Sequence, residues 1–358
     1  QFSLPSRMRV VFLFFGYALF CISWQRLLPP HYIAVLRAGQ KLPRRCGTVV
    51  RRPLSTNQRL SWRCQRIARE SQAGSSDPDW RDFRAFLVRK ERRDQLKGST
   101  KTTDADQMLD EFDAAWAYPT PLIEPGTLLL AQPGGQFVVR QPYFHKSLIL
   151  IVRHYADFDM GMIINRPTAI STAQLGLPGP PWPVWYGGDC EGLTGLPSNA
   201  ALHSLSTFCL HAWDEFASVS VEILAGIYIT SLETARELVQ QGDASDRSFL
   251  TVVGYCGWSD GQLQAELGRG SLWTAAAFDR RTLREEFRRA AAPTRSQRAA
   301  TASLDDGVAL WRRLYSMMGQ DSEEQLAAWR PDDSFGDLRL KTWIDEHLLD
   351  WKRGPLLE

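Results

Sequence analysis

The stretch VVGYCGWSDGQLQAEL, residues 252–267, decides the fold of this chain. Its apolar start belongs to a run from Phe249 to Tyr255 that is typical of a buried strand, since turn residues bound it. Ser259 and Gln262 have the spacing of a capping box, which predicts a helix through Leu267. A small residue between two glycines predicts tight packing. The predicted structural motif is Gly254, Tyr255, Gly257 and Trp258, with the indole as a core anchor.

Four further stretches stand in a fixed order around this one. They are EPGTLLLAQP (124–133), FHKSLILIVRH (144–154) followed by GMIINRP (161–167), WYGGD (185–189) and LWRRLYSMMG (310–319). Together the five resemble the AlgH/YqgE-like family, with INRP and GYxGW as the most specific pieces. The resemblance implies an α+β fold, a single domain with a mixed, partly barrel-like β-sheet surrounded by helices. It implies no reaction, because the family has no established catalytic activity and its old regulator label came from bacterial genetics.

Short apolar runs predict the strands of this block. They lie at 128–131, 147–152, 160–165, 223–229, 249–255 and 271–278. Pro167 is expected to stop pairing after the third run. Thr230 and Glu233 match a capping box for a helix that Gly242 ends. Residues 176–195 are rich in glycine and proline, which predicts a loop with room for one short strand.

A candidate ligand site combines three pairs of residues. Arg166 is expected where a strand gives way to a loop, and its planar fork suits an oxyanion. The alternative is internal: Asn165 caps the turn and Arg166 makes an ion pair. The other two pairs are Gly187 with Gly188, and Gln262 with Glu266 one helical turn further on.

The glycine pair allows either close approach of a ligand or a β-bulge. Most members of the resembled family have proline after these glycines, whereas this chain has Asp189. That difference puts any family-derived role of the loop in doubt.

Cys256 occupies the nucleophile position of a motif like G-x-S-x-G. We reject that interpretation, because relatives in the resembled family carry Ala or Ser there and no base is identifiable nearby. No catalytic residue is predicted.

No cofactor or metal is predicted either. His145, His154, His203 and His211 lack the spacing of metal ligands, and the chain has neither a P-loop nor a dinucleotide fingerprint. Scattered histidines of this kind are expected to be structural.

The first 69 residues carry 13 basic side chains and no acidic one. An apolar run within residues 8–23 predicts a signal peptide, and the Arg-rich segment 24–70 resembles an organelle transit peptide. A signal peptide followed by a transit peptide predicts delivery to a plastid. The secretory pathway and the mitochondrion are the alternatives. A presequence covering 1–75 leaves a mature form with no stable membrane span.

The mature chain is predicted to consist of three parts: a helical lead segment at 76–118, the domain at 119–330 with an insertion at about 280–306, and a helical tail at 331–358. In the lead segment, the spacing predicts one helix at 77–96 and another at 108–116. The apolar stripe of the first helix, expected to pack against the domain, is Trp80, Phe83, Leu87 and Val88. The apolar face of the tail is Leu338, Trp343, Ile344, Leu348 and Trp351.

These observations favour a non-enzymatic regulatory or protein-interaction module with an unidentified protein partner. One alternative is a small-anion sensor or enzyme centred on Arg166. The other is nucleic-acid binding, which is disfavoured because residues 70–358 carry 29 basic against 40 acidic side chains.

Overall fold

The computed structural model describes residues 80–97, 115–134, 137, 140–194, 205–291, 304–319, 324, 326–327 and 333–349. All of them belong to the second of two compact units, residues 65–358. The predicted presequence and residues 108–114 of the second lead helix lie outside the described residues. Among the described helices, none combines the length and the apolar character that a membrane span needs.

One six-stranded sheet is built mainly from the first apolar runs. In spatial order its strands are β1 (Ala117–Pro119), β12 (Trp273–Phe278), β2 (Leu128–Ala131), β3 (Leu148–His154), β4 (Phe158–Ile163) and β11 (Cys256–Ser259), all antiparallel. Leu128 and Leu130 enter one hydrophobic core, and Leu129 and Ala131 enter the other. Because both faces of the sheet are covered, this run is apolar at every position.

The second six-stranded sheet is mixed. Its order is β5 (Pro167–Ser171), β6 (Pro183–Tyr186), β10 (Leu250–Val253), β7 (Thr207–His211), β9 (Ile227–Ser231) and β8 (Val221–Leu224). β6 and β10 are parallel, and the other neighbours are antiparallel. The chain enters this sheet between β4 and β5 and leaves it between β10 and β11. The predicted α+β fold with a mixed, partly barrel-like sheet is confirmed, although both sheets stay open.

Three strand predictions need correction. Pro167 begins β5 and pairs with Trp185, so it does not end the sheet. The run 223–229 is a hairpin of β8 and β9, because Gly226 turns the chain with φ +79°. The run 249–255 ends at Val253, and the residues after it form β11 in the other sheet.

Two helix starts also differ from the prediction. α6 (Leu232–Gln241) is capped by Ser231, whose hydroxyl accepts from the backbone N–H of Thr234. Its predicted end at Gly242 is confirmed, with φ +83°. α7 (Gln262–Gly268) follows Gly261 as its N-cap, and the Ser259 N–H and hydroxyl both donate to Gln262 Oε1. The contact of the Gln262 side chain with Ser259 that the capping box predicts is present, although the helix itself begins after Gly261.

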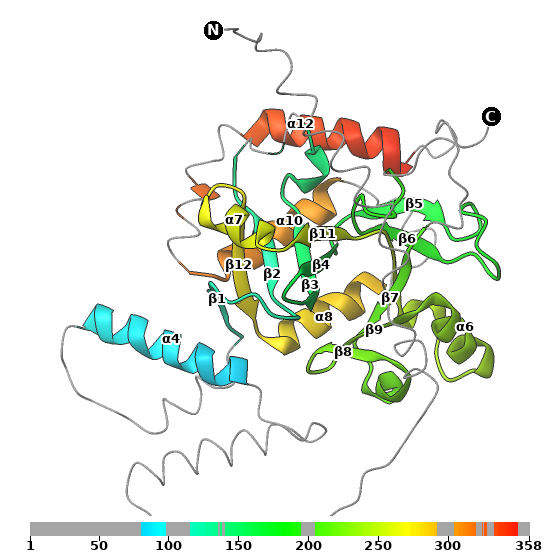
Figure 1. Ribbon diagram of the computed structural model, residues 1–358, viewed down its shortest axis with the longest axis horizontal. Helices are drawn as coiled ribbons and strands as arrows, with labels where there is room; N and C mark the ends of the chain where they lie inside the picture. Colours follow the sequence, from blue (N-terminus) through cyan, green and yellow to red (C-terminus); the bar gives the residue numbers. More distant parts are fainter. Residues whose placement is uncertain are drawn as a thin grey trace, which may run out of the picture. The chain divides into compact units, whose positions relative to one another are not determined.

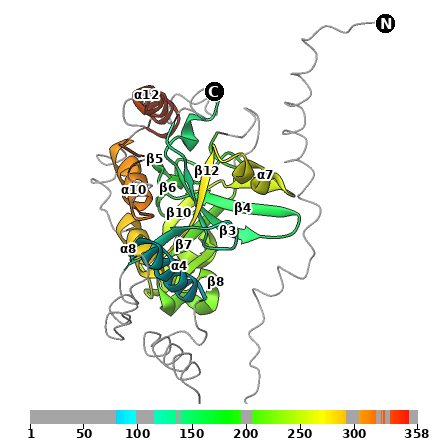
Figure 2. The ribbon, with the colours of Figure 1, turned by 90° about the vertical axis from the view of Figure 1, so that its left-hand side faces the viewer.

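Helices cover both faces of the sheets. α8 (Arg280–Ala291) and α10 (Leu304–Ser316) lie on one side, and α7 lies on the other (Figures 1 and 2). Leu283 and Phe287 of α8 are buried in the same core as Trp311 of α10. The stretch predicted as an insertion at about 280–306 therefore begins with a helix that contributes to the core, and residues 292–303 lie outside the described chain.

The tail forms α12 (Asp333–Ile344) and a π-helical turn at Asp345–Leu349. Trp343, Ile344 and Leu348 of the predicted apolar face are buried. Leu338 is 60 % exposed, because the docked face runs through Leu340 instead, and Trp351 lies outside the described residues. The tail is also tied electrostatically: Lys146 Nζ, 1 % exposed, lies 2.7 Å from Asp337 Oδ1.

The first lead helix, α4 (Trp80–Lys97), packs with a different face from the predicted one. Arg81, Ala85 and Phe86 are buried, whereas the predicted stripe residues Trp80, Phe83 and Leu87 are exposed. The reason is polar anchoring, since Arg81 Nε donates to Glu124 at 2.8 Å and Arg84 binds the same carboxylate. Only Val88 of the predicted stripe packs against the buried cluster.

Two glycine-rich segments cross each other where the sheets meet. Gly187 donates its N–H to Val253 O at 2.8 Å, Ile163 N–H donates to Gly187 O at 2.9 Å, and Cys190 pairs with Tyr255. A Cβ at Gly188 would lie 2.7 Å from Cys256 N, and one at Gly254 would lie 2.6 Å from the Cα of Gly192. We call this crossing of residues 187–192 and 254–256 the glycine joint.

Replacing Gly254 with Ala tests the joint. The new Cβ would collide with backbone atoms and would also have to adopt φ +77°, so we expect a loss of about 3–5 kcal/mol in the free energy of unfolding, measured in urea. Gly242→Ala is the matched control: its φ is +83°, but nothing lies within 4 Å of the new Cβ. That variant should lose only about 1 kcal/mol. Equal losses in the two variants would show that the close crossing has no special role.

Candidate functional site

Asn165 and Arg166 lie where the chain passes from β4 to β5, and both are buried. Asn165 Oδ1 accepts from Leu148 N–H at 2.9 Å, and its Nδ2 donates to Lys146 O and to Gly307 O of α10. Asn165 therefore links β3 to α10.

The Arg166 guanidinium is enclosed by backbone carbonyls. It donates to the carbonyl oxygens of Tyr143, His145 and Asn165, and the side chain is 1 % exposed. Burial lowers the pKa of Arg166 to about 9, which leaves it protonated at neutral pH. The alternative of an internal role has Arg166 inside the protein, as here, but the guanidinium bonds to backbone carbonyls rather than to a carboxylate. Ligand binding at Arg166 stays a prediction, and in this arrangement the guanidinium faces the interior.

The predicted glycine pair meets backbone rather than open space. Gly187 and Gly188 belong to the glycine joint, where their Cα atoms face the backbone of Gly254 to Cys256. In this structure the backbone that comes close to the two glycines belongs to the same chain, at residues 254–256.

Gln262 and Glu266 are brought together as their spacing predicts. Gln262 Nε2 donates to Glu266 Oε1 at 3.0 Å, and Glu266 Oε2 accepts from the indoles of Trp258 and Trp273 at 3.0 and 2.9 Å. The carboxylate thus ties α7 to β11 and β12, which gives Trp258 the anchoring role expected of it. The guanidinium of Arg166, the third part of the predicted site, bonds to other residues, namely the carbonyls of Tyr143, His145 and Asn165.

Cys256 is 4 % exposed, and its thiol donates to Gly187 O. Burial raises the pKa of this thiol well above its usual value, and the nearby Cys190 and Asp189 add to the rise. A thiol held in this protonated state is a poor nucleophile. The geometry accords with the rejection of a nucleophile elbow.

Asp189 forms a polar cluster that the sequence did not reveal. Its carboxylate accepts from the hydroxyls of Tyr143, Tyr186 and Thr194. Burial, and then the Asp189 charge, raise the pKa of both tyrosines. Trp343 of α12 packs on both rings, so the cluster lies beneath the tail. The unusual aspartate after the two glycines was its only sequence signal.

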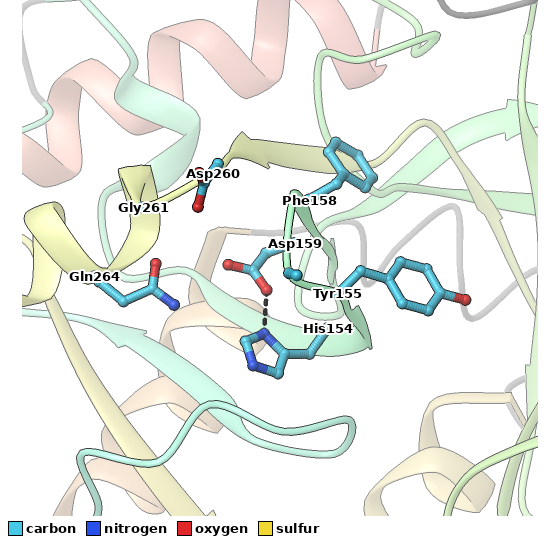
Figure 3. A pocket seen from close by; sticks show the side chains of 8 residues that line it. His154, Tyr155, Phe158, Asp159, Asp260, Gly261 and Gln264 are labelled. Carbon is cyan, nitrogen blue, oxygen red and sulfur yellow. Dashed lines mark hydrogen bonds and ion pairs between the residues drawn. The ribbon is translucent and has the colours of Figure 1, made fainter. Parts of the chain in front are cut away.

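An open pocket lies between the β3–β4 turn and the start of α7 (Figure 3). It measures about 270 Å³ and is lined by His154, Tyr155, Ala156, Phe158, Asp159, Asp260, Gly261 and Gln264. His154 and Asp159 are cross-strand partners, and Nδ1 of the imidazole lies 2.5 Å from Asp159 Oδ1. The two residues could have been paired from the sequence only if the register of the hairpin were known. The periodicity of apolar residues does not determine that register.

A carboxylate that orients an imidazole is part of many general-base sites. No serine, threonine or cysteine is among the residues that line this pocket. Across the described residues, no group of three or more His, Cys, Asp or Glu side chains is placed to hold a metal ion. The imidazole, the carboxylates and the amide give the pocket polar groups that can bind a ligand.

His211 and Ser220 also resemble a catalytic pair, with Nε2 and Oγ 2.8 Å apart. However, the Trp213 backbone N–H points at Nδ1, so the imidazole proton lies on Nε2 and is donated to the serine. To act as a general base, His211 would have to accept the proton of the Ser220 hydroxyl at Nε2, which already carries a proton here. His211 is 1 % exposed and stacks on Tyr228, and burial lowers its pKa to about 4.

Comparison with known proteins identifies the family. The AlgH-like family model matches residues 128–321. A UPF0301 protein of Xanthomonas campestris is 31 % identical over 175 residues, covering 46 % of this chain and 82 % of that protein. One from Cereibacter sphaeroides is 32 % identical over 158 residues, covering 42 % and 79 %. The solution structure of AlgH from Pseudomonas aeruginosa, 23 % identical, covers 52 % of this chain and 90 % of that one with a TM-score of 0.34.

Stability should depend on pH through His211. Its folded pKa of about 4 lies below the unfolded value of about 6.5, so the unfolded state binds the proton more readily between these limits. The contribution is fully present above pH 6.5 and is lost as the pH falls toward 4, by about 3 kcal/mol in all.

The comparison is urea unfolding of the wild-type chain and of His211→Phe at pH 7 and pH 4.5. The variant keeps the stacked ring and every carboxylate, so its loss on acidification should be smaller than that of the wild type by most of this amount. Identical losses would mean that His211 does not titrate as its surroundings suggest.

Proposed function

This chain belongs to the AlgH-like family, whose function is uncharacterised, and on that premise we propose that it is a non-enzymatic protein-interaction module of the plastid. The partner is taken to bind the outer face of α4. The observation that carries the proposal is the orientation of this helix. Polar anchors hold one face against the domain while the apolar residues of the other face point outward.

Three side chains form the outward apolar stripe. Trp80, Phe83 and Leu87 are 67 %, 41 % and 46 % exposed, and the rings of the first two meet edge to face. Their spacing of three and four residues places them along one side of the helix. Full burial of such side chains contributes about 1.5–3 kcal/mol each, which is enough for three of them to anchor a partner.

The charge of α4 points to an acidic partner. The helix carries seven basic and three acidic side chains, and two of the basic ones, Arg81 and Arg84, bind Glu124 of the domain. Lys90 lies one turn beyond the stripe and is exposed. Complementary charge steers association and sets the register of binding. The expected partner therefore presents an apolar ridge flanked by Asp and Glu.

The internal use of the candidate reactive groups supports a non-enzymatic role. Cys256 is protonated and buried, His211 donates its proton to Ser220, and Glu266 holds two indoles. An anion sensor centred on Arg166 has less support, because the guanidinium donates to three carbonyls inside the protein.

The plastid assignment is part of the proposal, and the acid-free N-terminal 69 residues support it. A fluorescent fusion at the C-terminus of the full chain, expressed in an alga with a complex plastid, should fill the plastid. Fluorescence in mitochondria or in the secretory pathway would contradict the assignment.

The partner proposal is tested with the full chain carrying Trp80→Ala, Phe83→Ala and Leu87→Ala together. Proteins captured from plastid extract by the wild type but not by this variant are purified and titrated. We expect an acidic binder whose affinity falls at least tenfold in the variant, because the anchoring stripe is gone, and which weakens as salt rises.

Val221→Ala is the matched control, since this apolar residue is 54 % exposed and belongs to β8 rather than to the stripe. It should leave binding intact. The triple variant should also keep its free energy of unfolding within about 0.5 kcal/mol, as expected of a free surface. The proposal is wrong if the variant is strongly destabilised, which would mean that the chain covers the stripe itself, or if only lipid vesicles depend on the stripe.

A further inference from the structure

We propose that the pocket beside the β3–β4 turn binds a primary ammonium group, carried either by a lysine side chain of a peptide or by a free small amine. The proposal does not depend on α4 or on its partner. It rests on how the lining residues are placed and on which of their polar atoms are already used.

Asp159 is the central group. Its side chain is 5 % exposed, and one oxygen is engaged by His154. The other oxygen points into the pocket, toward Gln264 (Figure 3). A carboxylate oxygen held in this way, largely screened from water, attracts a cation more strongly than an exposed one.

The position of Asp159 is fixed before any ligand arrives. It lies in β4 with His154 of β3 as its partner on one side and Trp258 of β11 on the other. Because both neighbouring strands are paired, little conformational freedom remains to be lost when a ligand binds.

Asp260 and Gln264 approach from the opposite wall. They follow β11 and lie at the beginning of α7, and Asp260 extends toward Asp159 (Figure 3). The pocket thus offers three acceptor groups, namely the carboxylates of Asp159 and Asp260 and the amide of Gln264. Tyr155 and Phe158 complete the lining, with their rings directed away from Asp260 and Gln264 (Figure 3).

An ammonium group matches this arrangement better than the other cations. It has three N–H donors that diverge from one nitrogen, and three converging acceptors can satisfy them. A guanidinium prefers a single carboxylate in its own plane. A metal ion would need a fuller set of charged ligands than the described residues place together.

The test follows the ¹³Cε1–H signal of His154 in the full chain by NMR. The ligands are Nα-acetyl-lysine amide, n-butylammonium and the neutral isostere Nα-acetyl-norleucine amide. We expect a saturable shift with the two ammonium compounds, with a Kd on the order of 1 mM, and none with the isostere. Tighter binding of the lysine amide than of n-butylammonium assigns the site to a peptide, and the reverse assigns it to a free amine.

Asp260→Asn is the informative variant, because Asp260 is exposed and its replacement leaves the His154–Asp159 pair in place. It should weaken binding of the lysine amide at least fivefold. Asp157→Asn is the matched control: an exposed acid on the same turn that does not line the pocket. The proposal is overturned by equal weakening in both variants, by an equal shift with the norleucine amide, or by the absence of a saturable shift.

Discussion

The glycine joint is the contact on which the rest of this structure depends. At this point the chain leaves one sheet for the other, and two backbone segments approach more closely than any side chain would allow. The Gly187 N–H donates to Val253 O, and the Gly254 N–H donates to Ser206 O. These bonds hold the parallel pair β6–β10 beside the end of β4, and they determine where β11 begins. The order of both sheets follows from this crossing.

The polar residues around the joint serve the same assembly. Asn165 and Arg166 bond to backbone at the other passage between the sheets, and Glu266 holds the indoles that follow the joint. Replacing any one of these three side chains with an apolar one would leave buried donors or acceptors without partners. Each such group lowers the free energy of unfolding by about 1–3 kcal/mol. The motifs that are the most specific in the sequence thus have structural roles in this fold.

The sequence predicted the fold better than the surface. Runs such as 128–131 are apolar because both faces are covered, so they could be identified as buried strands. The outward face of α4 could not, because an apolar stripe does not show that Arg81 is drawn inward by Glu124. The pairing of His154 with Asp159 depends on hairpin register, and the Asp189 cluster depends on tail docking. Each is set by contacts between residues far apart or by turn geometry, which local patterns do not contain.

Native-state amide hydrogen exchange tests the central role of the joint most directly. The amides of Gly187 and Gly254 should exchange only when the whole domain unfolds, at the same free energy as the buried amide of Val252 in β10. This result would show that the joint opens last, together with the core. Exchange of the two glycine amides many times faster than that of Val252, by local opening, would contradict the account.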